Sequence, residues 1–298
     1  MIRLGLVDFD TSHVIAFTQR INHLEVDPSE WVEGAQVVAG CPGESLMMPE
    51  RIAGYAEQLS GYGVELVDRP EDLIGRVDAV MIESNQGSQH LKRARPFLEA
   101  GVTTWVDKPF AGDVAQADEM LALARKHGAK LMSSSSLRFD PTVQEALARR
   151  EELGPILAAD VWGNAPLHPG NPGLLHYGVH GVEILYALVG AGCRFVHSVN
   201  TAQGEIVTGQ WKSGHVSAVR GLREGAYGFG FTAHYEKGHY SAVVEGAAFY
   251  REMLKAWIRY VETGEPPFDM AEAREIMAFM CAAEESNQSS GVRVSLAP

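Results

Sequence analysis

Lys108 is the side chain whose neighbours in the sequence most favour proton transfer. It follows the apolar run TTWV and Asp107, and Pro109 comes directly after it. The run predicts a strand of a parallel sheet, and open α/β sheets place their ligands at the carboxyl ends of such strands. A lysine that is partly withdrawn from water there, and held by Asp107, can exchange a proton with a substrate hydroxyl. The alternative is an ordinary surface lysine at the end of a strand.

His176, His180 and Glu183 form a second group of candidate residues. They are spaced i, i+4 and i+7 within the segment 173–190, so a helix over this segment would place all three on one face. Histidine is a natural general acid or base near neutral pH. The same three residues, joined by His168, offer ligands that suit zinc or a similar cation. The remaining interpretation is a polar stripe that packs against a sheet and does no chemistry.

The elements that must position Lys108 alternate between strand and helix over the first 135 residues. Apolar runs and helical periodicity predict strands at 2–8, 36–41, 64–67, 78–84, 103–109 and 130–136, and helices at 12–24, 49–61, 88–101 and 113–128. Such alternation implies right-handed crossovers and a doubly wound parallel sheet of the Rossmann type. We expect residues 1–137 to form this domain, with a helix from the end of the chain packing back on it.

The junction after the first predicted strand is unusual for such a sheet. A dinucleotide fingerprint needs glycines there, for a tight turn and for close approach of the pyrophosphate. The sequence reads DFDTSH, which puts Asp8, Asp10 and His13 at the glycine positions, where two carboxylates would repel phosphates. The hydroxyls of Thr11 and Ser12 can still face a ligand. The candidate cofactor-binding positions are therefore Asp8, Asp10, Thr11, Ser12, His13 and, after a later strand, Asn85.

From about residue 155 the sequence changes to closely spaced strands. They are predicted at 154–163, 195–203, 205–211, 215–222, 227–235 and 239–246, with helices at 173–190, 248–264 and 269–291. This pattern is typical of an open, mostly antiparallel sheet with helices on one face, an α+β domain that follows the α/β domain. We expect residues 138–298 to form this domain. Because an open apolar face needs cover, we also expect a homodimer or homotetramer.

Composition narrows the class of protein. The chain has 298 residues, 46% of them hydrophobic and 21% charged, which indicates a globular protein of about two domains. A net charge of −13 argues against nucleic acid and anionic membranes as partners. Cys41, Cys193 and Cys281 lack metal-like spacing and read as reduced thiols. With no signal peptide or membrane span in the sequence, the expectation is a cytoplasmic protein that binds a small molecule.

Several motifs in sequence order resemble those of the Gfo/Idh/MocA family of oxidoreductases. The stretch HLKRARPFLEAGVTTWVDKPF at 90–110 matches a family histidine, helix and "EKP" motif, here read as DKP. LRFDP at 137–141 is similar to "RRFxP", and HYGVHGVE at 176–183 is similar to "DxGxHxxD". The C-terminal segment 264–296 resembles the family's last helix and strand.

The resemblance implies a nucleotide-binding domain and a substrate domain that transfer hydride between NAD or NADP and a sugar or polyol hydroxyl. It assigns proton transfer to Lys108 and His180, with His176 standing where the family has an aspartate. On the substrate side it implies roles for Asp107, Arg138 and Glu183, of which Glu183 replaces an aspartate.

Three functions remain open on the sequence. The first is an oxidoreductase that uses NAD or NADP on a sugar, polyol or related hydroxy compound. The second is a non-redox enzyme, an isomerase, lyase or hydrolase, with or without a metal held by His176, His180 and Glu183. The third is a binding protein without catalysis. The altered fingerprint motivates the second, and the missing family aspartate at His176 motivates the third.

Overall fold

Two compact units divide the chain. The computed structural model describes residues 1–225, 227–246 and 248–296. The first unit comprises Met1–Ser134 together with Tyr250–Met270, and the second comprises Ser135–Phe249 together with the chain from Ala271 onward. Each unit has its own sheet.

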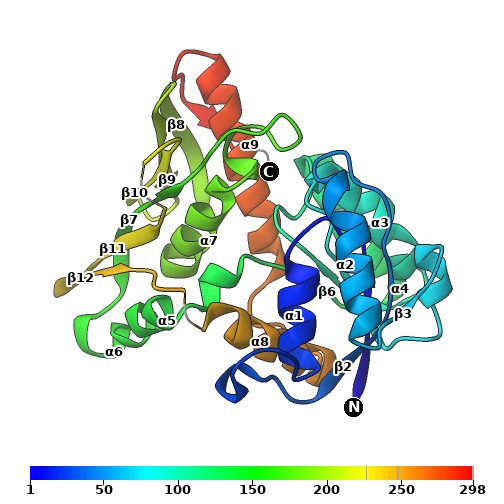
Figure 1. Ribbon diagram of the computed structural model, residues 1–298. Coiled ribbons are helices and arrows are strands. Elements are labelled where there is room, and N and C mark those ends of the chain that lie inside the picture. Colours follow the sequence, from blue (N-terminus) through cyan, green and yellow to red (C-terminus); the bar gives the residue numbers. More distant parts are fainter. Residues whose placement is uncertain (226, 247, 297–298) are drawn as a thin grey trace. The chain divides into compact units, whose positions relative to one another are not determined.

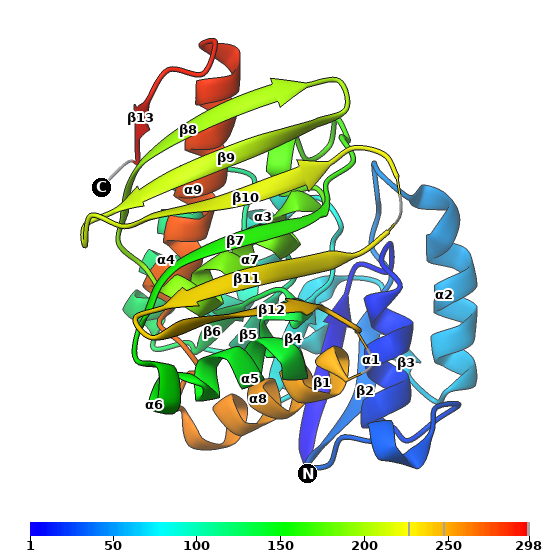
Figure 2. The same ribbon diagram turned by 90° about the vertical axis from the view of Figure 1, so that its left-hand side faces the viewer.

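The sheet of the first unit is parallel throughout its described strands. Its six strands run in the order β3-β2-β1-β4-β5-β6, and all six are labelled in Figure 2, which is Figure 1 turned by 90°. Their bounds are β1 (Ile2–Val7), β2 (Ala35–Cys41), β3 (Glu65–Leu66), β4 (Ala79–Ile82), β5 (Thr103–Val106) and β6 (Leu131–Ser133). The order reverses between β1 and β4, and ligands of doubly wound sheets bind beyond the carboxyl ends of the strands at such a point.

Helices connect these strands and cover the sheet. In this unit α1 contacts α2, and α3 contacts α4. A later helix, α8, packs here too, with the rings of Trp257 and Trp105 centred 5.8 Å apart. The bounds are α1 (His13–Ile21), η1 (Pro28–Glu30), α2 (Pro49–Gly61), η2 (Pro70–Leu73), α3 (Gly87–Glu99), α4 (Val114–His127) and α8 (Phe249–Thr263). Local signals fix the ends: at α4, Asp113 accepts a hydrogen bond from the backbone N–H of Gln116, and Gly128 ends the helix at φ 68°.

The sheet of the second unit is mixed and mostly antiparallel. Its seven strands within the described residues run in the order β12-β11-β7-β10-β9-β8-β13, and β7 and β10 are the parallel pair. Figure 2 shows one face of this sheet toward the viewer and α7 and α9 behind it. The strands are β7 (Ile156–Asn164), β8 (Cys193–Thr201), β9 (Gly204–Trp211), β10 (Val216–Leu222), β11 (Phe229–Tyr235), β12 (Gly238–Val243) and β13 (Val294–Ser295).

The helices of the second unit correct one sequence prediction. The segment predicted as a single helix at 173–190 is a 3-10 turn, η4 (Gly173–Leu175), followed by α7 (Gly178–Val189). His176 lies between them and therefore does not share a helical face with His180. The remaining helical segments are η3 (Ser136–Phe139), α5 (Pro141–Ala148), α6 (Arg150–Leu153) and α9 (Met270–Gln288).

The predicted fold class is confirmed: a Rossmann-like parallel sheet in the N-terminal part, and a mostly antiparallel sheet with helices in the C-terminal part. Among the described residues, no helix has both the length and the apolar character needed to cross a bilayer.

Candidate functional site

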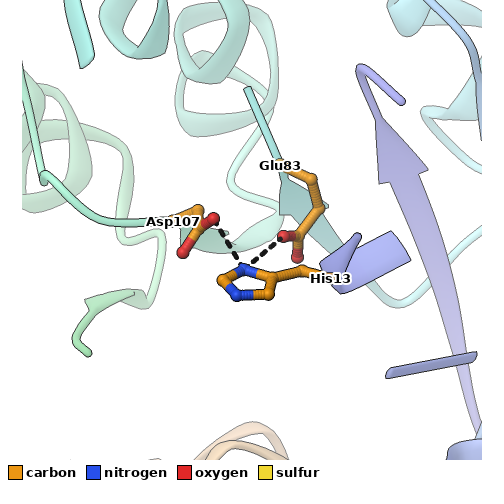
Figure 3. Close-up of side chains that lie close together, drawn as sticks. All are labelled: His13, Glu83 and Asp107. Atoms are coloured by element: carbon orange, nitrogen blue, oxygen red, sulfur yellow. Dashed lines mark hydrogen bonds and ion pairs between the residues drawn. The ribbon is translucent and has the colours of Figure 1, made fainter. Parts of the chain in front are cut away.

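Three side chains from separate elements of the first unit meet at the carboxyl edge of its sheet. His13 is the first residue of α1, Glu83 directly follows β4, and Asp107 directly follows β5 (Figure 3). Nδ1 of His13 lies 2.8 Å from Oδ2 of Asp107 and 3.8 Å from Oε2 of Glu83. We call these three residues the edge cluster.

Both carboxyl groups of the edge cluster are buried. Glu83 is 0% exposed and Asp107 is 1% exposed. The ring of His13 is held in place by stacking on Phe17, with ring centroids 4.8 Å apart, and by an edge contact with Tyr250. Neither carboxylate oxygen of Glu83 has a hydrogen-bond partner among the described residues. A buried carboxyl group of this kind is rare, because burial without a partner is costly.

The two carboxyl groups have opposite tendencies to ionise. Burial raises the pKa of Glu83 well above its ordinary value, and the nearby charge of Asp107 raises it further. Burial also acts to raise the pKa of Asp107, but the charges of His13 and Lys108 outweigh it and hold that pKa below its usual range. Adjacent acids whose pKa values separate in this way can serve as a proton donor and a proton acceptor.

Lys108 adjoins the edge cluster. Its side chain is buried at 9% exposure, and its backbone N–H donates a hydrogen bond of 2.7 Å to Oδ1 of Asp107. The structure therefore brings together Lys108, Asp107 and His13, three of the side chains that the sequence indicated, at the edge where a parallel sheet presents ligands.

The first altered glycine position is occupied by a buried aspartate, of which one carboxylate oxygen is hydrogen-bonded. Asp8 has φ 63°, the left-handed conformation that favours glycine, and is 1% exposed. Its Oδ2 accepts hydrogen bonds from the hydroxyl of Ser84 and, at 2.8 Å, from Nε of Arg93. Its Oδ1 reaches the next loop: a β-carbon built on Gly43 would lie 1.8 Å from that oxygen. Burial raises the pKa of Asp8, although Arg93 opposes this effect.

The second altered position binds two neighbouring segments. Oδ2 of Asp10 accepts a bond of 2.6 Å from the hydroxyl of Ser45, and Oδ1 accepts one of 2.9 Å from the backbone N–H of Asn85. The side chain of Asn85 donates to the backbone carbonyl of Asp10 at 2.7 Å. Burial raises the pKa of Asp10.

These residues do not fit a dinucleotide in its ordinary pose. The fingerprint leaves space beside glycine for the pyrophosphate and offers backbone N–H groups to it. Here carboxyl side chains stand at two of the glycine positions and are hydrogen-bonded to neighbouring segments, and a carboxylate there would repel a phosphate. Of the two hydroxyl residues, Ser12 is the N-cap of α1 without a side-chain capping bond, and Thr11 accepts a long 3.4 Å bond from the N–H of His13.

The histidines predicted from the segment 173–190 lie in the second unit and are not gathered with Glu183. Nδ1 of His180 lies 2.7 Å from the hydroxyl of Ser135, and the ring of His176 packs 5.1 Å from that of His168. Within the described residues, the group of acids and histidines that could share a cation is the edge cluster. The alternative metal site on His176, His180 and Glu183 is therefore not supported.

Arg138 and Glu183 are paired with each other. Nε of Arg138 donates to Glu183 at 2.9 Å, and its NH2 group lies 2.6 Å from Glu272. All three side chains are largely buried, so this guanidinium links η3 to α7 and α9. The contact with substrate predicted for Arg138 and Glu183 remains a prediction.

Glu83 and Arg93 are the residues of this site that the sequence analysis missed. Glu83 stands near the C-terminal end of the apolar run predicted as a strand at 78–84, and Asp78 at its start is the other charged residue of that segment. A charge at the end of a buried parallel strand, the strand that comes directly before that of Asp107 in the sequence, was the signal that could have found it.

The class of protein that this fold and site define is a Rossmann-type protein with an altered nucleotide loop. Residues 50–135 match the model of a family described as an oxidoreductase family with an NAD-binding Rossmann fold. D-apiose dehydrogenase of Paraburkholderia graminis is 29% identical over 148 residues, which cover 48% of this chain and 36% of that protein. The matched segments span about a third of the length of the curated relatives.

Solved structures share the fold over the whole chain. Myo-inositol dehydrogenase of Lactobacillus casei, in complex with NAD(H) and myo-inositol, is similar with a TM-score of 0.80 and 15% identity, covering 100% of this chain and 97% of that one. Myo-inositol dehydrogenase of Corynebacterium glutamicum has a TM-score of 0.79 and 19% identity, covering 100% and 99%. At these identities the likeness shows the fold.

The family match over residues 50–135 agrees with the resemblance to the Gfo/Idh/MocA family that the motifs predicted, and the shared fold is consistent with it. The family is one of NAD-binding oxidoreductases.

Proposed function

We propose that this chain is an oxidoreductase acting on a hydroxyl-bearing carbon of a sugar, polyol or related hydroxy compound. Lys108 is the group that takes or returns the hydroxyl proton. The observation that carries the proposal is a buried lysine beside two buried carboxyl groups at the carboxyl edge of a parallel sheet. The relatives described above act on compounds of this class by their names.

The roles of the residues follow from their contacts. Asp107 fixes the backbone of Lys108 through its 2.7 Å hydrogen bond and supplies a negative charge beside the ammonium group. The buried surroundings exclude water from the lysine, which favours proton exchange with a bound hydroxyl over exchange with solvent. For His180, whose Nδ1 lies 2.7 Å from the hydroxyl of Ser135, we propose a second role in proton transfer.

Oxidation of a hydroxyl-bearing carbon also requires a hydride acceptor, and nicotinamide is the acceptor of the family. The side chains of Asp8 and Asp10 do not fit its pyrophosphate in the ordinary pose. This observation favours a second candidate function, a non-redox enzyme in which Lys108 moves a proton during isomerisation or elimination.

Nicotinamide binding separates the two candidates. Purified protein is titrated with NADH and with NADPH up to millimolar concentration, and energy transfer from tryptophan and the melting temperature are followed. Saturable binding of either dinucleotide supports the oxidoreductase. If neither signal changes at millimolar dinucleotide, the oxidoreductase proposal fails and the non-redox enzyme is favoured.

A further inference from the structure

We propose that the edge cluster, His13, Glu83 and Asp107, binds a divalent first-row transition-metal cation that leaves coordination positions open to oxygen atoms of a small molecule. This inference goes beyond the proposed function, because it concerns binding of an ion and holds with or without redox chemistry.

The spacing of the three side chains suits one cation. Each residue offers one ligand atom, and these atoms all lie within 4.8 Å of one another. With metal–ligand bonds of about 2.0–2.2 Å, neighbouring ligand atoms are separated by roughly 3.0–3.5 Å. The two distances from Nδ1 of His13, 2.8 Å to Asp107 and 3.8 Å to Glu83, lie on either side of that range. A cation could therefore join all three atoms through small side-chain rotations.

Glu83 supplies an independent observation that points to a ligand. Its carboxyl group is completely buried, and neither oxygen has a hydrogen-bond partner among the described residues. In Figure 3 this carboxyl group is directed toward the imidazole of His13, as is that of Asp107. Buried charges in proteins are normally paired or coordinate metals. A carboxyl group that has no hydrogen bond within the described part of the chain, and that Nδ1 of His13 approaches to 3.8 Å, is suited to bind a cation together with that imidazole.

The charge around the cluster matches a dication. Asp10 lies near enough to interact electrostatically with both Glu83 and Asp107, and Lys108 does so from the positive side. With the imidazole of His13 neutral, as a metal ligand must be, the three ionised carboxylates outweigh the single ammonium group by two negative charges. A divalent cation would bring the buried edge of the sheet to neutrality.

The donor set indicates the class of metal. One imidazole nitrogen and two carboxylate oxygens suit Zn²⁺, Mn²⁺, Fe²⁺ or Co²⁺, and sites with three protein ligands keep positions open for water or substrate. A hydroxyl or carbonyl oxygen of a small hydroxy compound is the chemistry that would occupy those positions.

Metal binding to the intact protein tests the inference without any substrate or dinucleotide, so its outcome is separate from that of the proposed function. Protein purified without a histidine tag is stripped with a chelator and titrated calorimetrically with Mn²⁺ and with Zn²⁺. We expect one ion per chain and a rise in melting temperature. No binding of either ion at millimolar concentration overturns the proposal.

Two variants localise the ion. In Glu83→Gln we expect affinity to fall at least about tenfold, while the metal-free variant melts no lower than the metal-free wild type, because an orphaned carboxyl group has been removed. Asp8→Asn is the matched control: it alters another buried carboxylate at the same edge, and we expect it to keep the ion. Unchanged affinity in Glu83→Gln contradicts the assignment.

A spectroscopic measurement keeps the test decisive if Glu83→Gln does not fold. Wild-type protein is titrated with Co²⁺, whose visible absorption reports its ligands. We expect bands that differ from those of aqueous Co²⁺, saturate at one equivalent and disappear in His13→Asn. A spectrum that stays that of the aqueous ion overturns the proposal.

Discussion

At the scale of single residues, Asp8 shows how a side chain can take over the place of a missing glycine. Its backbone keeps the left-handed turn, at φ 63°, that the fingerprint glycine would make. Its carboxylate then uses the space beside that turn, bonding to Ser84 and Arg93. Left-handed conformations are costly for residues with a β-carbon, although less so for aspartate, and the contacts on both sides hold this one in place.

Restoring the glycines should improve dinucleotide binding. Asp8→Gly with Asp10→Gly removes two carboxylates and leaves Arg93 free to meet a phosphate. We expect NADH affinity to rise by about tenfold or more, because opposing a single like charge costs several kcal/mol. The measurement is fluorescence titration of the double variant against wild type.

The control for that experiment is Asp8→Asn with Asp10→Asn, which removes the charges but keeps the bulk of the side chains. We expect it to bind NADH less tightly than the glycine variant. If the glycine variant binds no more tightly than wild type, these two side chains are not what obstructs the dinucleotide.

Removal of the Lys108 amine should abolish most turnover. For Lys108→Met we expect the rate on an identified substrate to fall by about 10²–10⁴-fold, the usual contribution of a positioned acid or base. Lys92→Met is the matched control, because Lys92 is exposed on α3. Equal rates in wild type and Lys108→Met would remove the lysine from the proposed mechanism.

At the scale of elements, the loop after β2 and the end of β1 are packed as one unit around Asp8. Gly43 has φ 66°, and its missing side chain leaves room for Oδ1 of Asp8. The adjoining Ser45 donates its hydroxyl to Asp10. The two altered glycine positions therefore have compensating partners in the next connection of the sheet.

Gly43→Ala tests this packing. We expect the free energy of unfolding to fall by about 1–3 kcal/mol, from backbone strain and from the collision with Asp8. In the Asp8→Gly background the collision is absent, so the loss should be smaller. Urea denaturation of wild type, Gly43→Ala, Asp8→Gly and the double variant measures the coupling between the two positions. An equal loss in both backgrounds would show that Asp8 does not occupy this space.

The ion pairs of Arg138 with Glu183 and Glu272, which join η3, α7 and α9, predict a dependence of stability on pH. Burial raises the pKa of Glu183, and Glu272 raises it further while Arg138 lowers it, because one guanidinium serves two buried carboxyl groups. The folded chain therefore keeps this proton at pH values where the unfolded chain has lost it. The stability contributed is full below the unfolded pKa and is lost as the pH rises through the folded pKa.

Glu183→Gln removes this titration. As the pH rises from about 4 to about 8, we expect the unfolding free energy of the wild type to fall relative to that of the variant. Denaturant melts at a series of pH values measure it. A difference that moves in the opposite direction would mean that Arg138 lowers the pKa of Glu183 instead.

At the scale of the whole molecule, the open face of the second unit's sheet predicts self-association. Paired residues of neighbouring strands share a face, and one row across the open face is mostly apolar. Val199 and Val243, at its two ends, are 66% and 57% exposed. From β8 to β12 the row reads Val199, Ile206, Arg220, Trp162, Gly230 and Val243.

We therefore expect a homodimer or homotetramer in solution. Size-exclusion chromatography with light scattering at micromolar concentration gives the mass, and Ile206→Glu should shift it toward that of the monomer. Glu205 on the same strand is buried on the other face and is therefore unsuitable as a control. A change at the exposed Gln210, which lies on the face of Ile206 but outside the apolar row, serves as the control. A monomer at every concentration would contradict the expectation.

Local patterns determined much of this protein. Apolar runs separated by helical segments indicated the parallel sheet, because buried strands and helix ends are set by neighbouring residues. The same reading put Lys108 and Asp107 at a strand end and identified Asp8, Asp10 and His13 at the glycine positions.

Tertiary structure decided which of these side chains meet. His13 and Asp107 are 94 positions apart in the chain, and their contact depends on the order of the strands. Periodicity does not encode that order, so Glu83 joined the cluster only in the folded chain. For the same reason the sequence could not show that Arg138 is held by two glutamates, or that a break in the helix separates His176 from His180.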